Sequence, residues 1–177
     1  MMKHLAYLIL FTCLANVTWA QQTKAFTFSG QVFEMNLNDS TETPIMGVPI
    51  EVWYGEELLA TLESGPKGKY KIMLDKYPSF RIKFGKAPYI SKIIDINAKG
   101  FQRAAEFGLV NLEMDIIVFK EDNMMGMDFM NYTPFAKAQF NKKKGTMEWD
   151  YEYSDYMAKR VQAIVEANKY PVTRREE

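Results

Sequence analysis

The sequence is poor in the side chains that perform most nucleophilic and metal chemistry. It contains one histidine, His4, and one cysteine, Cys13, and both lie within the first 20 residues. We expect that segment to be removed, which leaves no imidazole and no thiol. Ser-His-Asp and Cys-His catalysis, disulfides and the usual zinc ligands then become unavailable. The sequence therefore predicts a protein that is not an enzyme, holds no cofactor or metal, and is stabilised by its hydrophobic core.

Long hydrophobic runs are also missing. Lys3 precedes a short apolar run from Leu5 to Leu14, and the small residue Ala20 follows. This order of charged, apolar and small residues is typical of a secretory signal peptide, with cleavage expected after Ala20. A run of about ten residues is shorter than the roughly 20 that span a bilayer. We therefore expect export to the periplasm or the exterior, and no transmembrane segment.

Lipid attachment at Cys13 is not expected. The segment from Leu10 to Cys13 loosely resembles a lipobox, but Phe11 and Thr12 stand where small residues are usual. Attachment there would also cut the hydrophobic run in half.

Neither sign of charge is in excess. The chain has 22 lysines and arginines and 22 aspartates and glutamates, and removal of Lys3 shifts this balance by only one unit. A nucleic-acid-binding protein is expected to carry a clustered basic face. The local run from Lys142 to Lys144 is interpreted as a solvated turn. We therefore expect no nucleic-acid partner.

Short alternating apolar runs, separated by turn residues, extend from Phe26 to Asn97. Runs spaced by about 8–12 residues are typical of an antiparallel sandwich or barrel. A further strand is expected from Leu109 to Phe119. The lack of helical crossovers between these runs excludes a parallel nucleotide-binding sheet. The expected inward residues are Phe26, Phe28, Val32, Val48, Ile50, Val52, Tyr54, Tyr70, Ile72, Leu74, Ile82, Phe84, Ile90, Ile93, Ile94 and Ile96.

The stretch "ESGPKGKYKI" has glycines and lysines that invite comparison with a phosphate-binding loop. Such a loop needs a longer glycine spacing and a helix after it, whereas here a strand pattern follows. Pro66 favours a turn, and Gly68 supplies the positive φ that closes it. We predict a structural hairpin turn at Gly65, Pro66 and Gly68.

The chain changes character after Phe119. We interpret the cluster of Met124, Met125, Met127 and Met130 as gap-filling where the tail packs on the sandwich, with an adaptable binding lip as the alternative. Residues 136–150 predict a hairpin that turns at Lys144-Gly145.

One amphipathic helix is expected next, capped by Asp150 or Ser154 and ended by Pro171. Helical spacing relates Tyr153, Met157, Val161, Ile164 and Asn168, with Val165 beside them. We divide the chain into a signal peptide (1–20), a β-sandwich (21–119), a connector, hairpin and helix packed on the sandwich (120–170), and a flexible tail (171–177).

Three segments, "FSGQVFE", "TPIMGVPIEVW" and "LATLESGPKGKYKI", carry a resemblance, in which Thr61, Gly68 and Tyr70 keep the family spacing loosely because residues 63–66 insert length. They resemble the carboxypeptidase regulatory-like domain, a seven-stranded, antiparallel, Greek-key sandwich of the transthyretin type. The segments "LEMDIIVFKE" and "PFAKAQFNKKKGTMEWDYEYSDYMAKRVQ" are similar to the C-terminal part of small secreted Bacteroidetes proteins. The resemblance implies an exported or cell-envelope module without catalysis of its own.

Aromatic residues provide the candidate binding sites. Trp53 falls on the face opposite Ile50 and Val52, where it forms either an exposed platform or a surface buried by the C-terminal helix. We favour burial, because the amphipathic helix needs an apolar partner. A second group consists of Trp149, Tyr151, Tyr153 and Tyr156.

Acidic residues next to these aromatics raise the possibility of glycoside hydrolysis. Glu148, Asp150 and Glu152 lie close together at a helix start, where negative charge suits the helix dipole. A catalytic pair is expected to come from different elements that meet in a cleft. We therefore predict a non-catalytic module that contacts another envelope protein or acts in envelope assembly. The alternative is a carbohydrate- or peptide-binding module that uses these aromatics, and the oligomeric state is left open.

Overall fold

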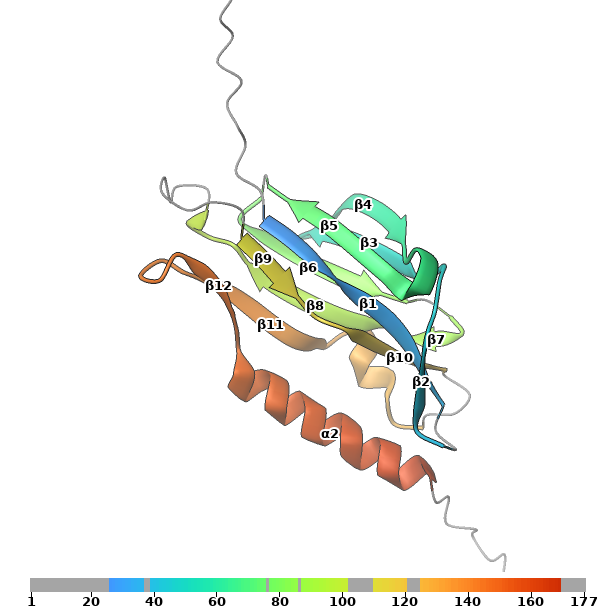
Figure 1. The fold of residues 1–177 in the computed structure, drawn as a ribbon. Coiled ribbons are helices and arrows are strands. Elements are labelled where there is room, and N and C mark those ends of the chain that lie inside the picture. The colour runs from blue at the N-terminus through green and yellow to red at the C-terminus, as the bar shows by residue number, and fades with distance from the viewer. Residues whose placement is uncertain are drawn as a thin grey trace, which may run out of the picture.

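A computed structural model describes residues 26–36, 39–75, 77–85, 87–101, 110–120 and 125–169. The expected signal peptide, Met124, Pro171 and the expected tail lie outside these ranges. Within them the chain is mainly β, with two sheets and one long helix (Figure 1).

The first sheet has the order β2-β1-β10-β7, and β5 and β9 also pair with β1. The second sheet has the order β12-β11-β8-β6-β3-β4. The short helices are η1 (Pro66–Gly68) and η4 (Asp128–Asn131), and the long helix is α2 (Tyr151–Lys169). The strands are β1 (Phe26–Asn36), β2 (Thr41–Pro44), β3 (Pro49–Tyr54), β4 (Glu57–Glu63), β5 (Lys69–Leu74), β6 (Ser79–Phe84), β7 (Tyr89–Ile90), β8 (Lys92–Asn97), β9 (Val110–Glu113), β10 (Ile116–Lys120), β11 (Pro134–Asn141) and β12 (Thr146–Trp149).

The predicted mainly β sandwich is confirmed, but both sheets are mixed, so its seven-stranded antiparallel Greek-key arrangement is not. β1 pairs in parallel with β9 and with β10, and β11 pairs in parallel with β8. The predicted hairpin forms between β11 and β12 and turns at residues 142–145. Its strands extend the second sheet instead of packing on it, so the predicted division after residue 119 cuts through one sheet.

The predicted strand from Leu109 to Phe119 is interrupted at Met114 and Asp115. The Met114 N–H donates to the Ser29 carbonyl at 3.1 Å, and the Tyr70 hydroxyl donates to the Met114 carbonyl at 2.6 Å. A Cβ atom on Gly30 would lie 2.0 Å from that carbonyl oxygen. Close approach of Met114 to the glycine backbone therefore breaks the strand into β9 and β10, a tertiary contact that alternation does not reveal.

The main core lies between the two sheets and is rich in aromatic side chains. Phe28 contacts the rings of Tyr70 and Phe84 edge-on, with centroids 5.4 and 6.2 Å apart. Nearly all of the predicted inward residues are buried. Tyr54 is the exception at 37 % exposed, because it ends β3 and stacks on Tyr77 instead.

A second apolar cluster forms under α2. Met157, Val161 and Val165 are buried on the helix, as its spacing predicts. Figure 1 shows α2 running beside β11, and residues of η4 and of the first sheet complete the cluster. Met127 and Met130 are fully buried here, whereas Met125 is 85 % exposed. Gap-filling is therefore correct for two of the three methionines that the structure describes.

Of the two predicted caps of this helix, Asp150 is confirmed. The Tyr153 N–H donates to Asp150 Oδ1 at 3.0 Å, which satisfies one of the free N–H groups of the first turn. The carboxylate also suits the positive end of the helix dipole.

The stretch from Gly65 to Gly68 forms a tight turn, as predicted. The Gly68 N–H donates to the Gly65 carbonyl at 3.0 Å, and the Gly65 N–H donates to the Lys69 carbonyl at 2.8 Å. Pro66 begins the short helix η1. The turn joins β4 to β5, which lie in different sheets, so it carries the chain across the sandwich and is not a hairpin.

Gly68→Ala is expected to destabilise the protein by about 2 kcal/mol or more. Gly68 has a φ of +70°, and a Cβ there would lie 2.3 Å from the Val32 carbonyl oxygen. Gly65→Ala is the matched control, because its φ is −83° and its Cβ would contact only the Lys69 carbonyl, at 3.5 Å. Urea unfolding of the two variants measures the difference, and equal midpoints would contradict this interpretation.

Lys92 is buried where the two apolar clusters meet. Its side chain is 4 % exposed, and its ammonium lies 4.1 Å from the centre of the Phe135 ring and 5.5 Å from that of Phe119. Burial lowers the pKa of Lys92 from 10.5 to about 7, with a weaker opposing effect from Glu42. The aromatic faces offset part of the cost of burying the charge, but desolvation remains the larger effect.

Lys92→Met is expected to stabilise the protein at neutral pH. Between pH 7 and pH 10.5 the unfolded chain keeps the Lys92 proton that the folded chain loses. The free energy of unfolding of the wild type therefore rises with pH over this range. The gain from methionine is therefore largest at pH 7 and below, where we expect a rise in Tm of at least about 4 °C, and it disappears towards pH 10.5. Thermal unfolding of wild type, Lys92→Met and the exposed control Lys71→Met across this range tests it. A gain independent of pH would show that the charge is not the cause.

Candidate ligand-binding groove

Four side chains form a row across the outer face of the second sheet. Trp53 on β3 pairs with Arg81 on β6, Arg81 pairs with Asp95 on β8, and Asp95 pairs with Lys137 on β11. Residues directly opposite each other on neighbouring strands point to the same face. The register of four strands therefore gathers an aromatic ring, two cations and one carboxylate in one line.

A second row lies beside the first and is uncharged. Ser79 on β6 pairs with Asn97 on β8, and Asn97 pairs with Gln139 on β11. A hydroxyl and two carboxamides provide both donors and acceptors of hydrogen bonds. The two rows together present two cations, a carboxylate, a hydroxyl and two carboxamides beside the indole of Trp53.

These rows line an open groove of about 720 Å³. Pro78, Lys99 and Asp150, the cap of α2, also line it. This volume falls within the usual range of small-ligand sites, about 300–1,000 Å³, but the lining is more polar than is typical of them. The groove suits a polar, solvent-exposed ligand better than a buried apolar one.

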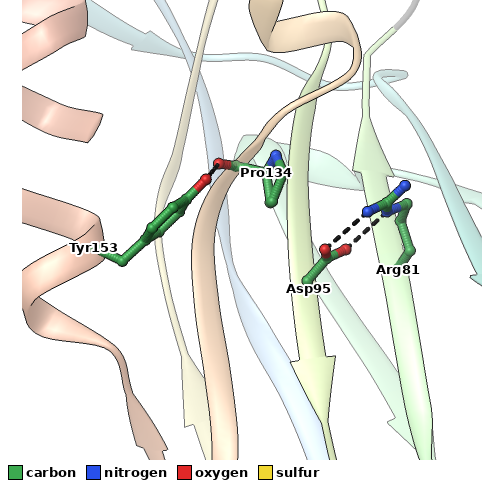
Figure 2. Close-up of polar contacts among 4 residues, drawn as sticks. All are labelled: Arg81, Asp95, Pro134 and Tyr153. Atoms are coloured by element: carbon green, nitrogen blue, oxygen red, sulfur yellow. Dashed lines mark hydrogen bonds and ion pairs between the residues drawn. The ribbon is translucent and has the colours of Figure 1, made fainter. Parts of the chain in front are cut away.

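A bidentate ion pair occupies the middle of the groove. Arg81 Nε and Nη2 each donate to a different oxygen of Asp95 at 2.8 Å (Figure 2). The Asp95 carboxylate raises the pKa of Arg81 further above its usual range. A half-exposed pair of this kind adds at most about 1 kcal/mol to stability. Its main effect is to hold the guanidinium and carboxylate planes in fixed positions on the face.

Tyr153 fastens α2 to the edge of the groove. Its hydroxyl donates to the Pro134 carbonyl at 2.6 Å (Figure 2), and the Lys137 ammonium lies 3.8 Å from the centre of its ring. Burial, followed by the charge of Asp95, raises the pKa of the Tyr153 phenol. Tyr153 therefore positions the helix and Lys137 and is not an open ligand platform.

Trp53 is half-buried and is not covered by α2, so the preferred interpretation from sequence is wrong. The helix packs on β11, and β8 and β6 lie between β11 and β3. The Trp53 indole N–H donates to Glu51 at 3.2 Å, and Trp53 lines the groove. The helix finds its apolar partner in the second cluster, so the Trp53 end of the face is left open.

The other predicted aromatics do not join Trp53 in one site. Trp149 pairs with the buried Ala138 and packs edge-on against Phe28, with centroids 6.1 Å apart, so it faces the core. Tyr151 and Tyr156 lie on α2 and are 74 % and 59 % exposed. Of the five aromatic candidates, only Trp53 lines the groove.

The acidic residues of the predicted group have structural partners. Glu148 accepts from Asn141 Nδ2 at 2.9 Å and from Lys144 Nζ at 2.7 Å, and these bonds lower its pKa. A catalytic acid needs a raised pKa, which is the opposite shift. Among the described residues no group of three histidines, cysteines, aspartates or glutamates is arranged to hold a metal ion.

Sequence reasoning missed most of the groove. Arg81 and Asp95 alternate with buried residues, as Lys137 does between Ala136 and Ala138, and such positions are usually only a solvated face. The signal that joins them is the strand register, which cannot be read from one sequence when paired residues such as Asp95 on β8 and Lys137 on β11 lie far apart in the chain.

No helix in the described ranges is long and apolar enough to cross a membrane.

Comparisons with known proteins return only distant structural similarity. No family model and no curated protein sequence matches the chain. A shaft pilin of Lactobacillus rhamnosus GG is 10% identical with a TM-score of 0.38, over 55% of this chain and 50% of the pilin. A minor pilin of Streptococcus agalactiae is 12% identical with a TM-score of 0.36, over 55% and 45%. The 5-hydroxyisourate hydrolase of Klebsiella pneumoniae is 16% identical with a TM-score of 0.34, over 54% and 97%. The chain spans about half the length of the two pilins, and its function is inferred from its own residues.

Tyr153→Phe is expected to lower the free energy of unfolding by about 1 kcal/mol, because it removes the bond to the Pro134 carbonyl and keeps the ring under Lys137. Tyr151→Phe is the control, since Tyr151 is exposed. Urea unfolding followed by circular dichroism measures both. If the two variants unfold at the same midpoint, Tyr153 does not fasten the helix.

Proposed function

We propose that the protein is a non-catalytic, exported β-sandwich module that contacts another protein of the cell envelope through the groove on its second sheet. The observation that carries this proposal is the row of Trp53, Arg81 and Asp95 on a part of the sheet that α2 leaves uncovered, with Lys137 on β11 at the end of the row next to the helix. The resemblance of residues 26–97 to the carboxypeptidase regulatory-like domain, and of the C-terminal part to small secreted Bacteroidetes proteins, supports the same kind of role.

The chemistry of the groove fits the surface of a protein partner. Trp and Arg are enriched at protein interfaces, where each combines a large apolar area with hydrogen-bonding groups. Trp53 and Arg81 lie side by side here, and Arg81 is held in place by Asp95. A positioned guanidinium loses little conformational entropy on binding, which favours affinity.

The carboxylates in and near the groove are engaged as hydrogen-bond acceptors, which supports a binding role. Glu148 has a lowered pKa, and Asp150 is occupied as a helix cap. Asp95 already accepts hydrogen bonds from Nε and Nη2 of Arg81. These carboxylates act as positioned acceptors, and binding is the function that they support.

A carbohydrate ligand is the second candidate at the same groove. An indole beside a hydroxyl and two carboxamides offers an apolar surface and both donors and acceptors to a sugar ring. Trp53 beside Ser79, Asn97 and Gln139 provides this combination.

Affinity capture from an envelope extract of the source organism tests the proposal. We expect wild type to retain the same protein reproducibly. Arg81→Glu should retain at least about tenfold less of that protein, because the substitution removes the guanidinium and the new glutamate repels Asp95. Lys71→Glu, an exposed change on β5 of the other sheet, is the matched control and should retain the partner.

Two outcomes would contradict a protein partner at this groove. One is a captured protein that Arg81→Glu and Lys71→Glu retain equally. The other is saturable binding of defined glycans that shifts the fluorescence of Trp53 and is lost in Trp53→Phe, which would assign the groove to carbohydrate.

A further inference from the structure

The strand β4 is an open edge of the second sheet. Among the described strands it pairs only with β3, so one side of its backbone has no strand partner. An edge strand presents a row of free N–H and C=O groups to which another extended chain can bind. Seven residues, Glu57 to Glu63, form this edge.

The other edges carry features that discourage pairing. β5 has the exposed residues Lys69 and Lys71, and β2 ends at Pro44. β9 and β12 have only four residues each, and β7 has two. Lysine, proline and shortness are the usual means by which sheets avoid edge-to-edge association. β4 is longer, and its sequence ELLATLE has neither lysine nor proline.

The register of β4 with β3 is regular over part of the strand and bulged over the rest. A bulge lies at Leu59, because Val52 and Trp53 of β3 pair with Ala60 and Leu58. From Ala60 to Glu63 the register with β3 is regular. These four residues form the continuous part of the open edge.

An apolar side chain marks the same edge. Leu58 is 46 % exposed and pairs with Trp53, so it lies on the groove side of the sheet. A strand added to β4 would cover Leu58 and extend the surface that begins at Trp53. The open edge and the groove are therefore continuous.

Charge indicates what kind of chain the edge accepts. Glu57 begins β4, Glu63 ends it, and Glu56 precedes it. A second copy paired antiparallel about Ala60 would place Glu57 opposite Glu63, and like charges in that position are destabilising. An extended segment with lysine or arginine at its ends avoids this repulsion.

We propose that β4 is the docking edge for an extended segment of a partner protein, with β-branched or apolar residues at its centre and basic residues at its ends. The segment adds a seventh strand to the six-stranded second sheet. Backbone hydrogen bonds supply the affinity, as in other strand additions, and pairing of opposite charges at the ends supplies the preference for a basic segment. This inference rests on the proposed role in protein contact and names the partner's conformation and charge.

Hydrogen exchange with a defined peptide tests the edge directly. The probe is a seven-residue peptide of alternating valine and threonine with a lysine at each end. We expect it to slow amide exchange within Ala60–Glu63 and to bind about tenfold more tightly than the same peptide with glutamate at each end. A version N-methylated at every residue between the two terminal lysines should give no protection, because neither of its edges can then donate backbone hydrogen bonds to β4.

Reversing the charges at the two ends of β4 should reverse its preference between the lysine-ended and the glutamate-ended peptide. Glu57→Lys/Glu63→Lys is expected to bind the glutamate-ended peptide better than the lysine-ended one, and both side chains are exposed. Leu58→Lys should weaken either peptide about tenfold, since lysine blunts an edge. Thr146→Lys, an exposed change on the β12 edge, is the control and should leave binding unchanged.

Several results would overturn the proposal. These are protection by neither peptide, protection confined to another edge, or a preference that charge reversal leaves unchanged. A dimer in analytical ultracentrifugation that Leu58→Lys dissociates would replace the partner segment with a second copy. Arg81→Glu should not alter peptide protection of β4, so failure of the groove and failure of the edge give different results.

Discussion

The parallel pairing of β11 with β8 is the contact on which the rest of the molecule depends. It brings Lys137 and Gln139 into line with Asp95 and Asn97, and so completes one side of the groove. It also places Pro134, whose carbonyl accepts the Tyr153 hydroxyl, at the point where α2 is fastened. Without β11 in the sheet, the groove would lose one side and the helix its attachment.

The same pairing explains the burial of a lysine. Phe135 lies at an irregularity of β11, between Pro134 and Ala136, and its ring covers the Lys92 ammonium from one side. Phe119 of β10 covers it from another. Lys92 thus lies where both sheets and the second apolar cluster meet. Burying its charge there costs free energy, and the packing of these elements has to offset that cost.

Alternation along the sequence was a good guide to which side chains point inward. Ile82 and Phe84 are buried and Arg81 between them faces out, as a period of two requires. The helix was also predictable, because Asp150, Met157, Val161 and Val165 follow capping and spacing rules that act within one segment. These features depend on neighbours in the chain.

The arrangement of the strands depends on contacts between distant segments, and there the sequence was a poor guide. The break at Met114 comes from its approach to Gly30, and the faces of Trp53 and Trp149 follow from strand pairing. Both tryptophans lie in strands with similar patterns, yet one lines the groove and the other packs on Phe28. Only the register distinguishes them.

The position of α2 determines which part of the second sheet remains available for binding. The helix covers the β11 side and uses its apolar face against η4 and the first sheet, so it has none left for β3. The uncovered part runs from Asp95 across Arg81 and Trp53 to the exposed Leu58 on β4. Charged and amide groups dominate at its centre, whereas unpaired backbone and an apolar side chain dominate at its edge. A partner that engages both would need side chains for the groove and an extended backbone for β4, which is a more selective requirement than either surface makes alone.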